Sequence, residues 1–314
     1  MIGEDLLKAS EILKRGELVA IPTETVYGLA ANALDPSAVA KIYDAKERPS
    51  FNPLIVHVAS IKEAKKYVKE FPEIAEQIAK AFWPGSISLL LPKHSIIPDL
   101  TTAGLPNVVI RVPNHPLTLE LLKSLDFPLA APSANLSNTV SPTTAEHVQL
   151  GLGSKIDYIL DGGKSAIGLE STILAIKQDK LVILREGGVS REDILAKTGI
   201  KVGVNFSNKI QSPGNLKKHY STSKPLYIVQ DINKYIDSNP NGRYSALLFE
   251  EKKVLCKSHI LSKTYSMSEI ANNLFDYMRR ADNDNSDCIL IEPIKEIGIG
   301  RAIADRIVRA ASKI

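Results

Sequence analysis

The sequence predicts an α/β protein of two domains, because short apolar runs and segments of helical period alternate along most of the chain. The first 200 residues form one such series, and residues 225–314 form a shorter one. Residues 201–224 are rich in Ser, Asn, Lys and Gly and show little periodicity, so we expect an extended linker there. With 314 residues, the chain is long enough for each domain to bury its own core.

In the first domain, short apolar runs are typical of strands in a covered sheet. They lie at 18–21, 54–58, 87–91, 108–112, 129–131, 158–160, 171–176 and 182–185. Apolar residues at helical spacing predict helices at 6–13, 38–43, 61–68, 71–81 and 117–125.

The second domain repeats the pattern on a smaller scale. Strands are predicted at 226–229, 245–249 and 288–291, and helices at 267–281 and 301–311. This alternation predicts a small doubly wound domain.

Composition narrows the class of protein. Apolar residues make up 44% of the chain and charged residues 24%, which is typical of a globular protein and not of a disordered one. The net charge of +4 favours anionic ligands but is too weak by itself to indicate nucleic-acid binding. The six histidines form no metal-binding motif, so no protein-bound metal site is expected.

The chain has two cysteines, Cys256 and Cys288, which we expect to be free thiols in a reducing compartment. No signal peptide is recognisable at the N-terminus, and no apolar run approaches the roughly 20 residues of a membrane span. We therefore expect a cytoplasmic protein without membrane contact. The glycines at 162–163 and 298–300 fit neither a phosphate loop nor a dinucleotide fingerprint.

Four regions place polar and cationic side chains at predicted strand ends. Each could by itself be a capped helix start or a solvated loop. Together they line one predicted cleft that holds Lys46, Arg48, Arg111 and Arg185 and no covalent nucleophile. Such a cleft suits catalysis by positioning and charge neutralisation, as in nucleotidyl transfer. The regions are PTETVYGL (22–29), KERPSFNPLIVH (46–57), APSANLS with SPTTAEHV (131–148), and DGGKSAIGLESTI with LREGG (161–188).

These stretches, together with FWPG (82–85) and VIRVPNH (109–115), strongly resemble the Sua5/YrdC/YwlC family and cover nearly all of residues 1–195. SPGNLKKHY (212–220) and GIGRAIADRIVRAA (298–311) resemble the longer, two-domain Sua5 form. The resemblance implies a YrdC-like open twisted sheet with helices and a positively charged cavity, joined to a smaller Rossmann-like C-terminal domain.

The resemblance also implies an activity. L-Threonine, bicarbonate and ATP would give L-threonylcarbamoyladenylate, pyrophosphate and water, for formation of N6-threonylcarbamoyladenosine at position 37 of tRNAs that read ANN codons. The tRNA threonylcarbamoyl-transfer machinery would act downstream, and direct contact with tRNA stays open. Mg²⁺ would accompany ATP, held by phosphates and water, so no metal ligands are named.

Residue roles carry over by position. Lys46 and Arg48 are the implied catalytic cations, with Lys46 near the bicarbonate and phosphates. The implied threonine site comprises Thr25, His57, Arg111, Ala131 (through its backbone) and Ser171. The implied ATP site comprises Arg48, Asn52, Asn107, Ser133, Asn135, Ser141, Arg185 and Tyr220, with Tyr220 closing over the nucleotide.

Some positions depart from the family pattern. Asn215, Ser221 and Thr222 replace the usual Met and Ala-Pro of the spacer, and Asn107 stands where Thr is common. These departures concern two contacts implied for ATP: the closing of Tyr220 over the nucleotide, and the contact of Asn107.

Two other readings stay open. One is a carbamoyl-transfer enzyme of related fold, although such enzymes carry zinc-finger modules and this chain has no CxxC pair. The other is a non-catalytic RNA-binding protein, for which the 6% of aromatic residues are sparse. For the C-terminal domain, we hypothesise that it orders the spacer and docks the partner that transfers the product.

Overall fold

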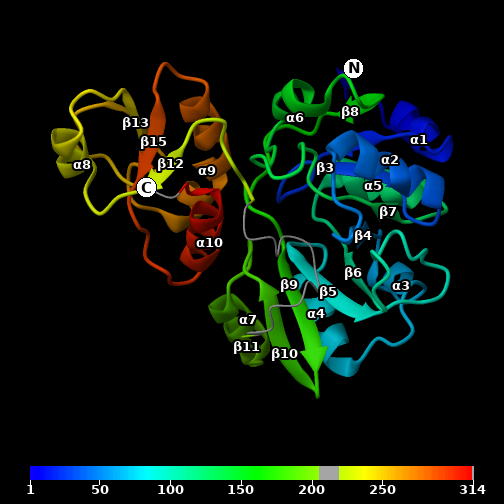
Figure 1. Ribbon diagram of the computed structural model, residues 1–314. Helices are drawn as coiled ribbons and strands as arrows, with labels where there is room; N and C mark the ends of the chain where they lie inside the picture. Colours follow the sequence, from blue (N-terminus) through cyan, green and yellow to red (C-terminus); the bar gives the residue numbers. More distant parts are fainter. Residues whose placement is uncertain (205–218, 313–314) are drawn as a thin grey trace.

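The computed structural model describes residues 1–204 and 219–312, which form two α/β units, each built on one sheet (Figure 1). The first sheet has eleven strands in the order β1-β8-β2-β3-β7-β4-β6-β5-β9-β10-β11. Its pairing is mixed: β4 and β6 run parallel, whereas β5 and β6 run antiparallel. The predicted α/β class and the open, helix-covered sheet are confirmed.

The strands of the first sheet are short, and most of them are buried. They are β1 (Ile2–Gly3), β2 (Val19–Ile21), β3 (Gly28–Asn32), β4 (Ile55–His57), β5 (Ile87–Pro92), β6 (Asn107–Arg111), β7 (Leu129–Ala130), β8 (Tyr158–Leu160), β9 (Thr172–Lys177), β10 (Lys180–Arg185) and β11 (Val202–Val204).

Seven helices accompany these strands in the described part of this unit. They are α1 (Leu6–Lys14), α2 (Pro36–Lys46), α3 (Ile61–Ala64), α4 (Glu73–Phe82), α5 (Pro116–Ser124), α6 (Ala145–Leu152) and α7 (Arg191–Thr198).

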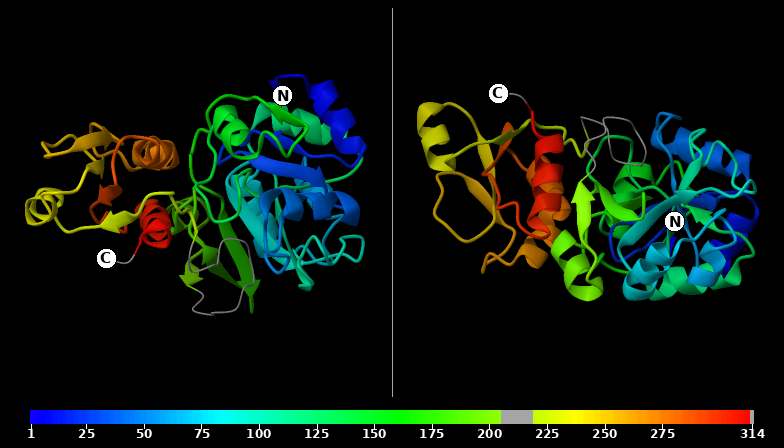
Figure 2. Two further views of the ribbon diagram at one scale, coloured as in Figure 1. Left: turned by 45° about the horizontal axis from the view of Figure 1, so that its top comes forward. Right: turned by 90° about the horizontal axis from the view of Figure 1, so that it is seen from below.

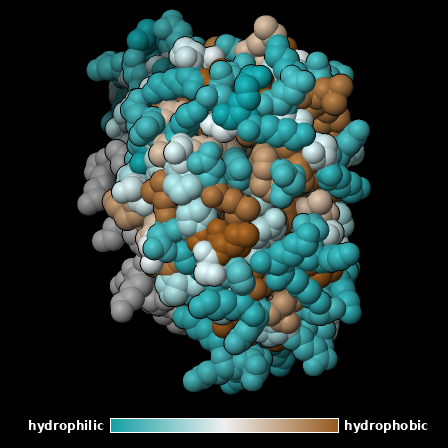
Figure 3. Space-filling model, turned by 90° about the vertical axis from the view of Figure 1, so that its right-hand side faces the viewer, coloured by the Kyte–Doolittle hydropathy of each residue, from teal (hydrophilic) through white to brown (hydrophobic). Residues whose placement is uncertain are grey.

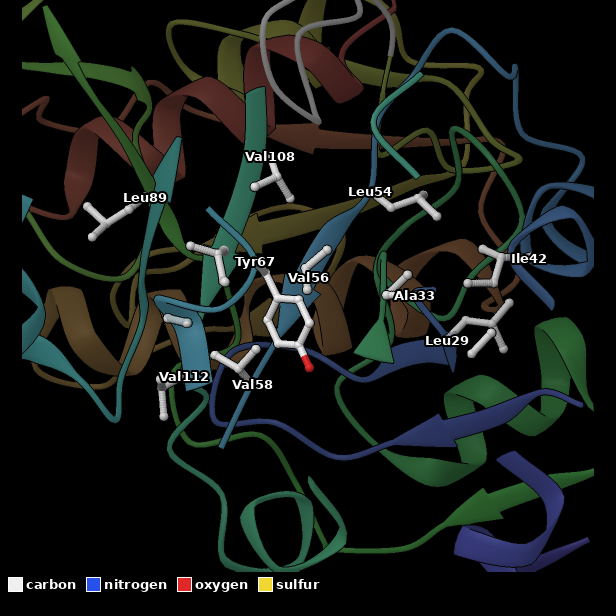
Figure 4. Close-up of a cluster of buried hydrophobic side chains, with 14 of the residues drawn as sticks. Leu29, Ala33, Ile42, Leu54, Val56, Val58, Tyr67, Leu89, Val108 and Val112 are labelled. Atoms are coloured by element: carbon white, nitrogen blue, oxygen red, sulfur yellow. The ribbon is translucent and has the colours of Figure 1, made fainter. Parts of the chain in front are cut away.

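Strand alternation decides which helices cover which face. In β3, Leu29 and Ala31 face a core shared with α2, α4 and α6, whereas Ala30 faces a second core with α1 and α5. Figure 4 shows part of the first core, including Leu29, Val56 and Val108. The central strands are therefore apolar on both faces, which explains their nearly continuous hydrophobic sequence.

The sequence did not reveal β3, because Gly28-Leu29-Ala30-Ala31-Asn32 lacks the β-branched and aromatic residues that favour strands. The segment is a strand because it pairs with β2 on one side and β7 on the other. The predicted helix at 61–68 is also shorter than expected, since α3 ends at Ala64. Helices α6, α7 and α8 (Ile232–Ser238) and strands β1, β11 and β14 (Lys257–Ile260) were not predicted.

The second unit has a four-stranded, wholly parallel sheet in the order β12-β15-β13-β14. Its strands are β12 (Leu226–Ile228), β13 (Tyr244–Leu248), β14 (Lys257–Ile260) and β15 (Cys288–Ile291). Its helices are α8 (Ile232–Ser238), α9 (Met267–Asp282) and α10 (Gly300–Ala310). The parallel sheet with intervening helices agrees with the predicted doubly wound domain.

Helices α9 and α10 lie on the side of the second sheet that meets the first unit (Figures 1 and 2). Apolar residues of these helices share one buried cluster with Val26, Val140 and Leu169 of the first unit. The interface between the units is therefore a hydrophobic core, and it lies beside the PTETVYGL and GLEST segments.

The predicted linker at 201–224 is only partly an extended connection. Val202–Val204 form β11, which pairs in parallel with β10 and belongs to the first sheet. Asn215 and most of the predicted spacer motif lie outside the described residues. After this gap, Ser221 donates its backbone N–H to the Asn138 carbonyl at 2.7 Å, and Thr222 Oγ1 donates to the Lys224 carbonyl.

Figure 3 shows the face of the first unit that points away from the second. Most of this face is hydrophilic, and hydrophobic residues gather near its centre and at its upper right edge. No helix between residues 1–204 or 219–312 has both the length and the apolar character needed to cross a bilayer.

Candidate active site

A cavity lies at one edge of the first sheet, where β4 and β6 end and β5 and β9 begin. His57 and Arg111 are paired at the ends of β4 and β6, and Ile87 and Thr172 are paired at the starts of β5 and β9. The cavity is lined by Thr23, Thr25, Val26, Gly28, Arg48, Ile55, His57, Arg111, Ala131, Pro132, Ser133, Glu170, Ser171, Arg185, His219 and Tyr220.

Strand alternation turns the polar side chains toward this cavity. In β4, Val56 packs into the main core, the one shared with α2, α4 and α6, so Ile55 and His57 face the other side of the sheet. In β6, Ile110 enters the same core and Arg111 faces the cavity. Ser171 precedes β9 and also lines the cavity.

Arg185 reaches the cavity through a β-bulge. Ile183 of β10 pairs with Leu174 and enters the main core, but the register shifts before Arg185, which pairs with Ile173. In a regular strand without the bulge, residue 185 would lie on the same face as Ile183 and point into the apolar core. The bulge therefore places the cation on the cavity side.

Arg111 is buried and held on three sides. Nε donates to the Gly85 carbonyl at 3.0 Å, Nη1 donates to Thr25 Oγ1 at 3.0 Å, and Nη2 forms an ion pair with Glu24 Oε1 at 2.5 Å. The guanidinium has five N–H groups, so two stay available to a ligand carboxylate. Glu24 is a site residue that the sequence analysis missed, although it lies inside the quoted PTETVYGL motif.

Thr25 is fixed by a local turn. Thr23 Oγ1 accepts hydrogen bonds from the backbone N–H groups of Thr25 and Val26, both at 3.2 Å, and lies 2.8 Å from Thr25 Oγ1. Such side-chain-to-backbone bonds stabilise turns at the expense of regular structure. The turn holds the Thr25 hydroxyl against Arg111.

His57 is a neutral side chain at physiological pH. Burial, reinforced by the charge of Arg111, lowers the pKa of His57 to about 3. Its Nδ1 lies 3.3 Å from the Ile55 carbonyl oxygen. A neutral imidazole in this position can donate a hydrogen bond to a ligand or accept one from it without adding charge.

Ser171 joins the two sides of the cavity. Its Oγ lies 2.8 Å from Ser88 Oγ and accepts a hydrogen bond from Arg185 Nη2 at 3.1 Å. Arg185 Nε also donates to the Ser171 carbonyl at 3.1 Å. Burial, partly offset by Tyr220 and Glu170, lowers the pKa of Arg185 to about 10, so its charge persists at physiological pH.

Arg48 follows the left-handed C-cap residue Glu47 at the end of α2. Its Nε donates to the Asn52 carbonyl at 3.1 Å and its Nη2 to the Pro53 carbonyl at 3.0 Å, so the side chain is fixed before any ligand binds. Burial lowers the pKa of Arg48 to about 10. The Asn52 side chain is buried, and both of its polar atoms are without a hydrogen-bond partner in the described part of the chain.

Lys46 does not line the cavity. Its Nζ is buried beneath the loop after β7 and donates to the carbonyls of Ser133 at 2.6 Å and Asn135 at 2.5 Å. Burial lowers the pKa of Lys46 well below its usual range, and the nearby charge of Arg48 acts in the same direction. The structure thus places Lys46 as a support for the loop that carries Ser133.

Asn135 supports the same loop. Its Nδ2 donates to the carbonyls of Leu136 at 2.8 Å and Thr139 at 2.9 Å. Within the loop, the Ala131 N–H donates to the Ile55 carbonyl, which leaves the Ala131 carbonyl as the backbone group that a ligand can meet.

Ser141 contacts the cavity through Glu170. Its Oγ donates to Glu170 Oε1 at 2.6 Å, and Arg306 Nε of α10 donates to Glu170 Oε2 at 2.9 Å. Glu170 and Arg306 both lie in motifs noted in the sequence, but their partnership joins residues 136 positions apart. No local pattern could have shown it.

His219 and Tyr220, which follow residues 205–218 in the sequence, also line the cavity. The Tyr220 ring stacks on Phe275 of α9 with centroids 5.3 Å apart. The His219 N–H donates to the Arg309 carbonyl of α10 at 3.2 Å. Tyr220 therefore lines the cavity, and its closing over the nucleotide stays a prediction.

Asn107 is not brought to the cavity. It opens β6, which Arg111 closes, so four residues of extended chain, about 13 Å, separate the two. Asn107 pairs with Pro92 and lines a different hollow with Leu105 and Pro106. The structure does not support the predicted ATP contact of Asn107, because β6 places this residue at the end of the strand away from the cavity. The spacing of residues in the sequence did not show this direction.

The site carries a net positive charge. Arg48, Arg111 and Arg185 line the cavity, while the carboxylate of Glu24 is paired with Arg111 and that of Glu170 with Arg306. Within the described ranges, no group of three or more His, Cys, Asp or Glu side chains could hold a metal ion. The arrangement can bind an anion and stabilise negative charge that develops on it.

Comparison with known proteins decides the family. Residues 11–187 match the Sua5/YciO/YrdC model, whose description is telomere recombination, and residues 189–312 match the model of the threonylcarbamoyl-AMP synthase C-terminal domain. The chain belongs to the Sua5/YciO/YrdC family.

Relatives in this family match along nearly the whole chain. The threonylcarbamoyl-AMP synthase of Bacillus subtilis is 41% identical over 320 residues, covering 98% of this chain and 92% of that protein. The Pyrococcus abyssi synthase is 39% identical, covering 96% and 93%. The crystal structure of P. abyssi Sua5 complexed with L-threonine superposes with a TM-score of 0.92 at 35% identity, covering 99% and 97%.

Proposed function

We propose that this protein is a threonylcarbamoyl-AMP synthase of the two-domain Sua5 form. It condenses L-threonine, bicarbonate and ATP into L-threonylcarbamoyladenylate, pyrophosphate and water, for threonylcarbamoylation of tRNA. The observation that carries the proposal is one cavity in which an Arg111–Thr25 pair and two desolvated cations, Arg48 and Arg185, face the same space. The full-length likeness to named synthases and to a threonine-bound Sua5 supports it.

Threonine occupies the Arg111 side of the cavity. Two N–H groups of Arg111 bind its carboxylate, a charge-assisted contact of the strong type. Thr25, His57 and Ser171 bind the amine and the side-chain hydroxyl. Because these partners are buried, an amino acid without the hydroxyl leaves a polar group unpaired and binds more weakly.

The chemistry proceeds in two steps. The neutral threonine amine attacks the carbon of bicarbonate or CO₂, forming an N–C bond and, from bicarbonate, releasing water. A carbamate oxygen then attacks the α-phosphorus of ATP, and the bond to the β-phosphate oxygen breaks as pyrophosphate leaves. The reaction is thus a nucleotidyl transfer in which the enzyme positions reactants and stabilises charge.

Arg48 and Arg185 stabilise the phosphates. Their pKa values near 10 leave both charged at neutral pH, in surroundings where burial strengthens electrostatic contacts. Mg²⁺ enters with ATP as part of the substrate. The carboxylates of Glu24 and Glu170 are both paired with arginines, so phosphate oxygens and water are the ion's main ligands.

The product is a mixed anhydride, so a reaction that transfers its threonylcarbamoyl group must consume it. We propose that this group goes to tRNA and that the protein acts with the tRNA-modifying machinery in the cytoplasm.

One rival retains support from the fold. Full-length HypF, solved in a phosphate- and nucleotide-bound form, shares the fold with a TM-score of 0.54 at 23% identity over 59% of this chain. That likeness shows a shared fold alone, and it covers only 29% of the HypF chain. A carbamoyl-transfer activity is therefore the alternative that the test must separate.

The test is pyrophosphate release from ATP by the purified protein. Release should require both threonine and bicarbonate, should be weak with valine, which has the shape of threonine without its hydroxyl, and should fall at least about a hundredfold in Arg48→Ala, as loss of one transition-state contact does elsewhere. Carbamoyl phosphate should not replace bicarbonate. ATP binding without threonine-dependent release would refute the synthase and favour the rival.

A further inference from the structure

One side chain of the second unit reaches the first unit's cavity wall. Arg306 of α10 has an exposed fraction of 0%. Its Nε donates to Glu170 Oε2 at 2.9 Å, and its Nη1 donates to Asp305 Oδ2 at 2.8 Å. Because a buried guanidinium is costly unless it is paired and hydrogen-bonded, this contact fixes where α10 sits on the first unit.

Glu170 uses both carboxylate oxygens. Oε2 accepts from Arg306 and Oε1 accepts from Ser141 Oγ at 2.6 Å. Burial opposes the charge on Glu170, but Arg306, Arg185 and the Ser141 hydroxyl outweigh it and hold the pKa at about 2. Glu170 is therefore an ionised link between α10 and the Ser141 hydroxyl.

Arg306 also contacts Tyr220. Its guanidinium carbon lies 5.4 Å from the centre of the Tyr220 ring, within the range of a cation–π contact. The backbone of Tyr220 has a φ of 63°, a left-handed conformation that a residue with a Cβ adopts only when its surroundings fix it. Arg306 and the stacked ring of Phe275 provide those surroundings.

These contacts all belong to one half of the cavity. Ser141 and Tyr220 are residues of the expected ATP site, whereas Arg306 forms no hydrogen bond or ion pair with Thr25, His57 or Arg111 of the expected threonine site within the described residues. The second unit thus touches the nucleotide half through the Phe275 ring and the Arg309 carbonyl, and through one buried guanidinium, that of Arg306.

We propose that Arg306 is a positioning residue for the nucleotide half of the active site. Through Glu170 it holds the Ser141 hydroxyl, and with its own guanidinium face it holds the Tyr220 ring. Seating of the second unit therefore sets the affinity for ATP and leaves the affinity for threonine nearly unchanged. This inference rests on the proposed synthase function.

The test compares Arg306→Met with Arg301→Met in the full-length protein. Arg301 lies on the same helix and also bridges the units, pairing with Glu192 at 2.5 Å. It is 24% exposed, and Glu192, unlike Glu170, does not line the cavity. In Arg306→Met we expect the KM for ATP to rise at least about tenfold, and that for threonine less than about threefold. Arg301→Met should retain both values.

Two further variants guard against simple loss of folding. Glu170→Gln/Arg306→Met removes both charges, so it should regain thermal stability over Arg306→Met while its KM for ATP stays high. Arg306→Lys keeps the charge without the planar fork and should recover only part of the ATP affinity.

An equal rise of both KM values, or a double variant with normal KM for ATP, would overturn the inference. Failure of the synthase proposal looks different, because wild type and Arg301→Met would then show no threonine-dependent pyrophosphate release.

Discussion

Replacing Lys46 by Met separates a supporting role of this lysine from a direct one. Lys46 has an exposed fraction of 1%, and its ammonium group donates to two carbonyls, those of Ser133 and Asn135. Methionine has nearly the same length but no donor. The substitution therefore leaves the buried Asn135 carbonyl and the partly buried Ser133 carbonyl without this donor while keeping the shape of the core.

The size of the effect follows from these two bonds. A buried acceptor left unsatisfied costs about 1–3 kcal/mol, so two cost about 2–6 kcal/mol. Methionine no longer has a charge to keep out of water, which returns part of that amount. We expect a net loss of about 2–4 kcal/mol, or about 5–10 °C in Tm for a protein of this size.

Thermal unfolding and steady-state pyrophosphate release measure the two consequences. Because the affected loop carries Ser133, the KM for ATP should rise more than kcat falls. Lys41→Met is the matched control, since Lys41 lies on the same helix in an exposed ion pair with Glu17 and should shift Tm by less than about 2 °C. A Lys46→Met protein with unchanged Tm and a collapsed kcat would refute the supporting role and make Lys46 a direct catalytic charge.

Three further predictions follow from the site. In Glu24→Gln, one amide oxygen must serve both the Asn114 N–H and Arg111, and Arg111 loses its ion pair while keeping the bonds to Gly85 and Thr25. The unfolding free energy should fall by about 3 kcal/mol and the KM for threonine should rise, and unchanged threonine kinetics would count against this role. Stability should fall as the pH drops from 6.5 to 5, by about 2 kcal/mol for His57 alone, because its folded pKa is about 3 and the unfolded chain takes up the proton first. Glu170, with a folded pKa of about 2, extends that loss below pH 4.5; urea unfolding at several pH values checks the sign, and a pH-independent stability would contradict it. Asn107→Ala should leave the KM for ATP within about twofold, and a larger rise would mean that the nucleotide reaches the far end of β6.

Local pattern was sufficient for much of the fold. Apolar runs bounded by Pro or Gly located β4, β5 and β6, and helical spacing located α2 and α9, because these segments have the periodicity of the surface they bury. It was insufficient for β3, whose small residues favour a helix as much as a strand, and whose strand form depends on pairing with β2 and β7.

The same division holds at the site. The sequence by itself determined which chemical groups are available, namely the arginines, hydroxyls and glycines near strand ends. It also determined the family whose motifs these residues match. Tertiary structure decided which of them meet. A register shift turns Arg185 toward the cavity, strand direction carries Asn107 to the opposite edge, and burial places Lys46 beneath a loop. Glu170 and Arg306 became partners only when α10 packed on the first unit. The physical reason is that alternation and helical period act over a few residues, whereas a binding cavity is assembled from segments brought together by the packing of whole elements.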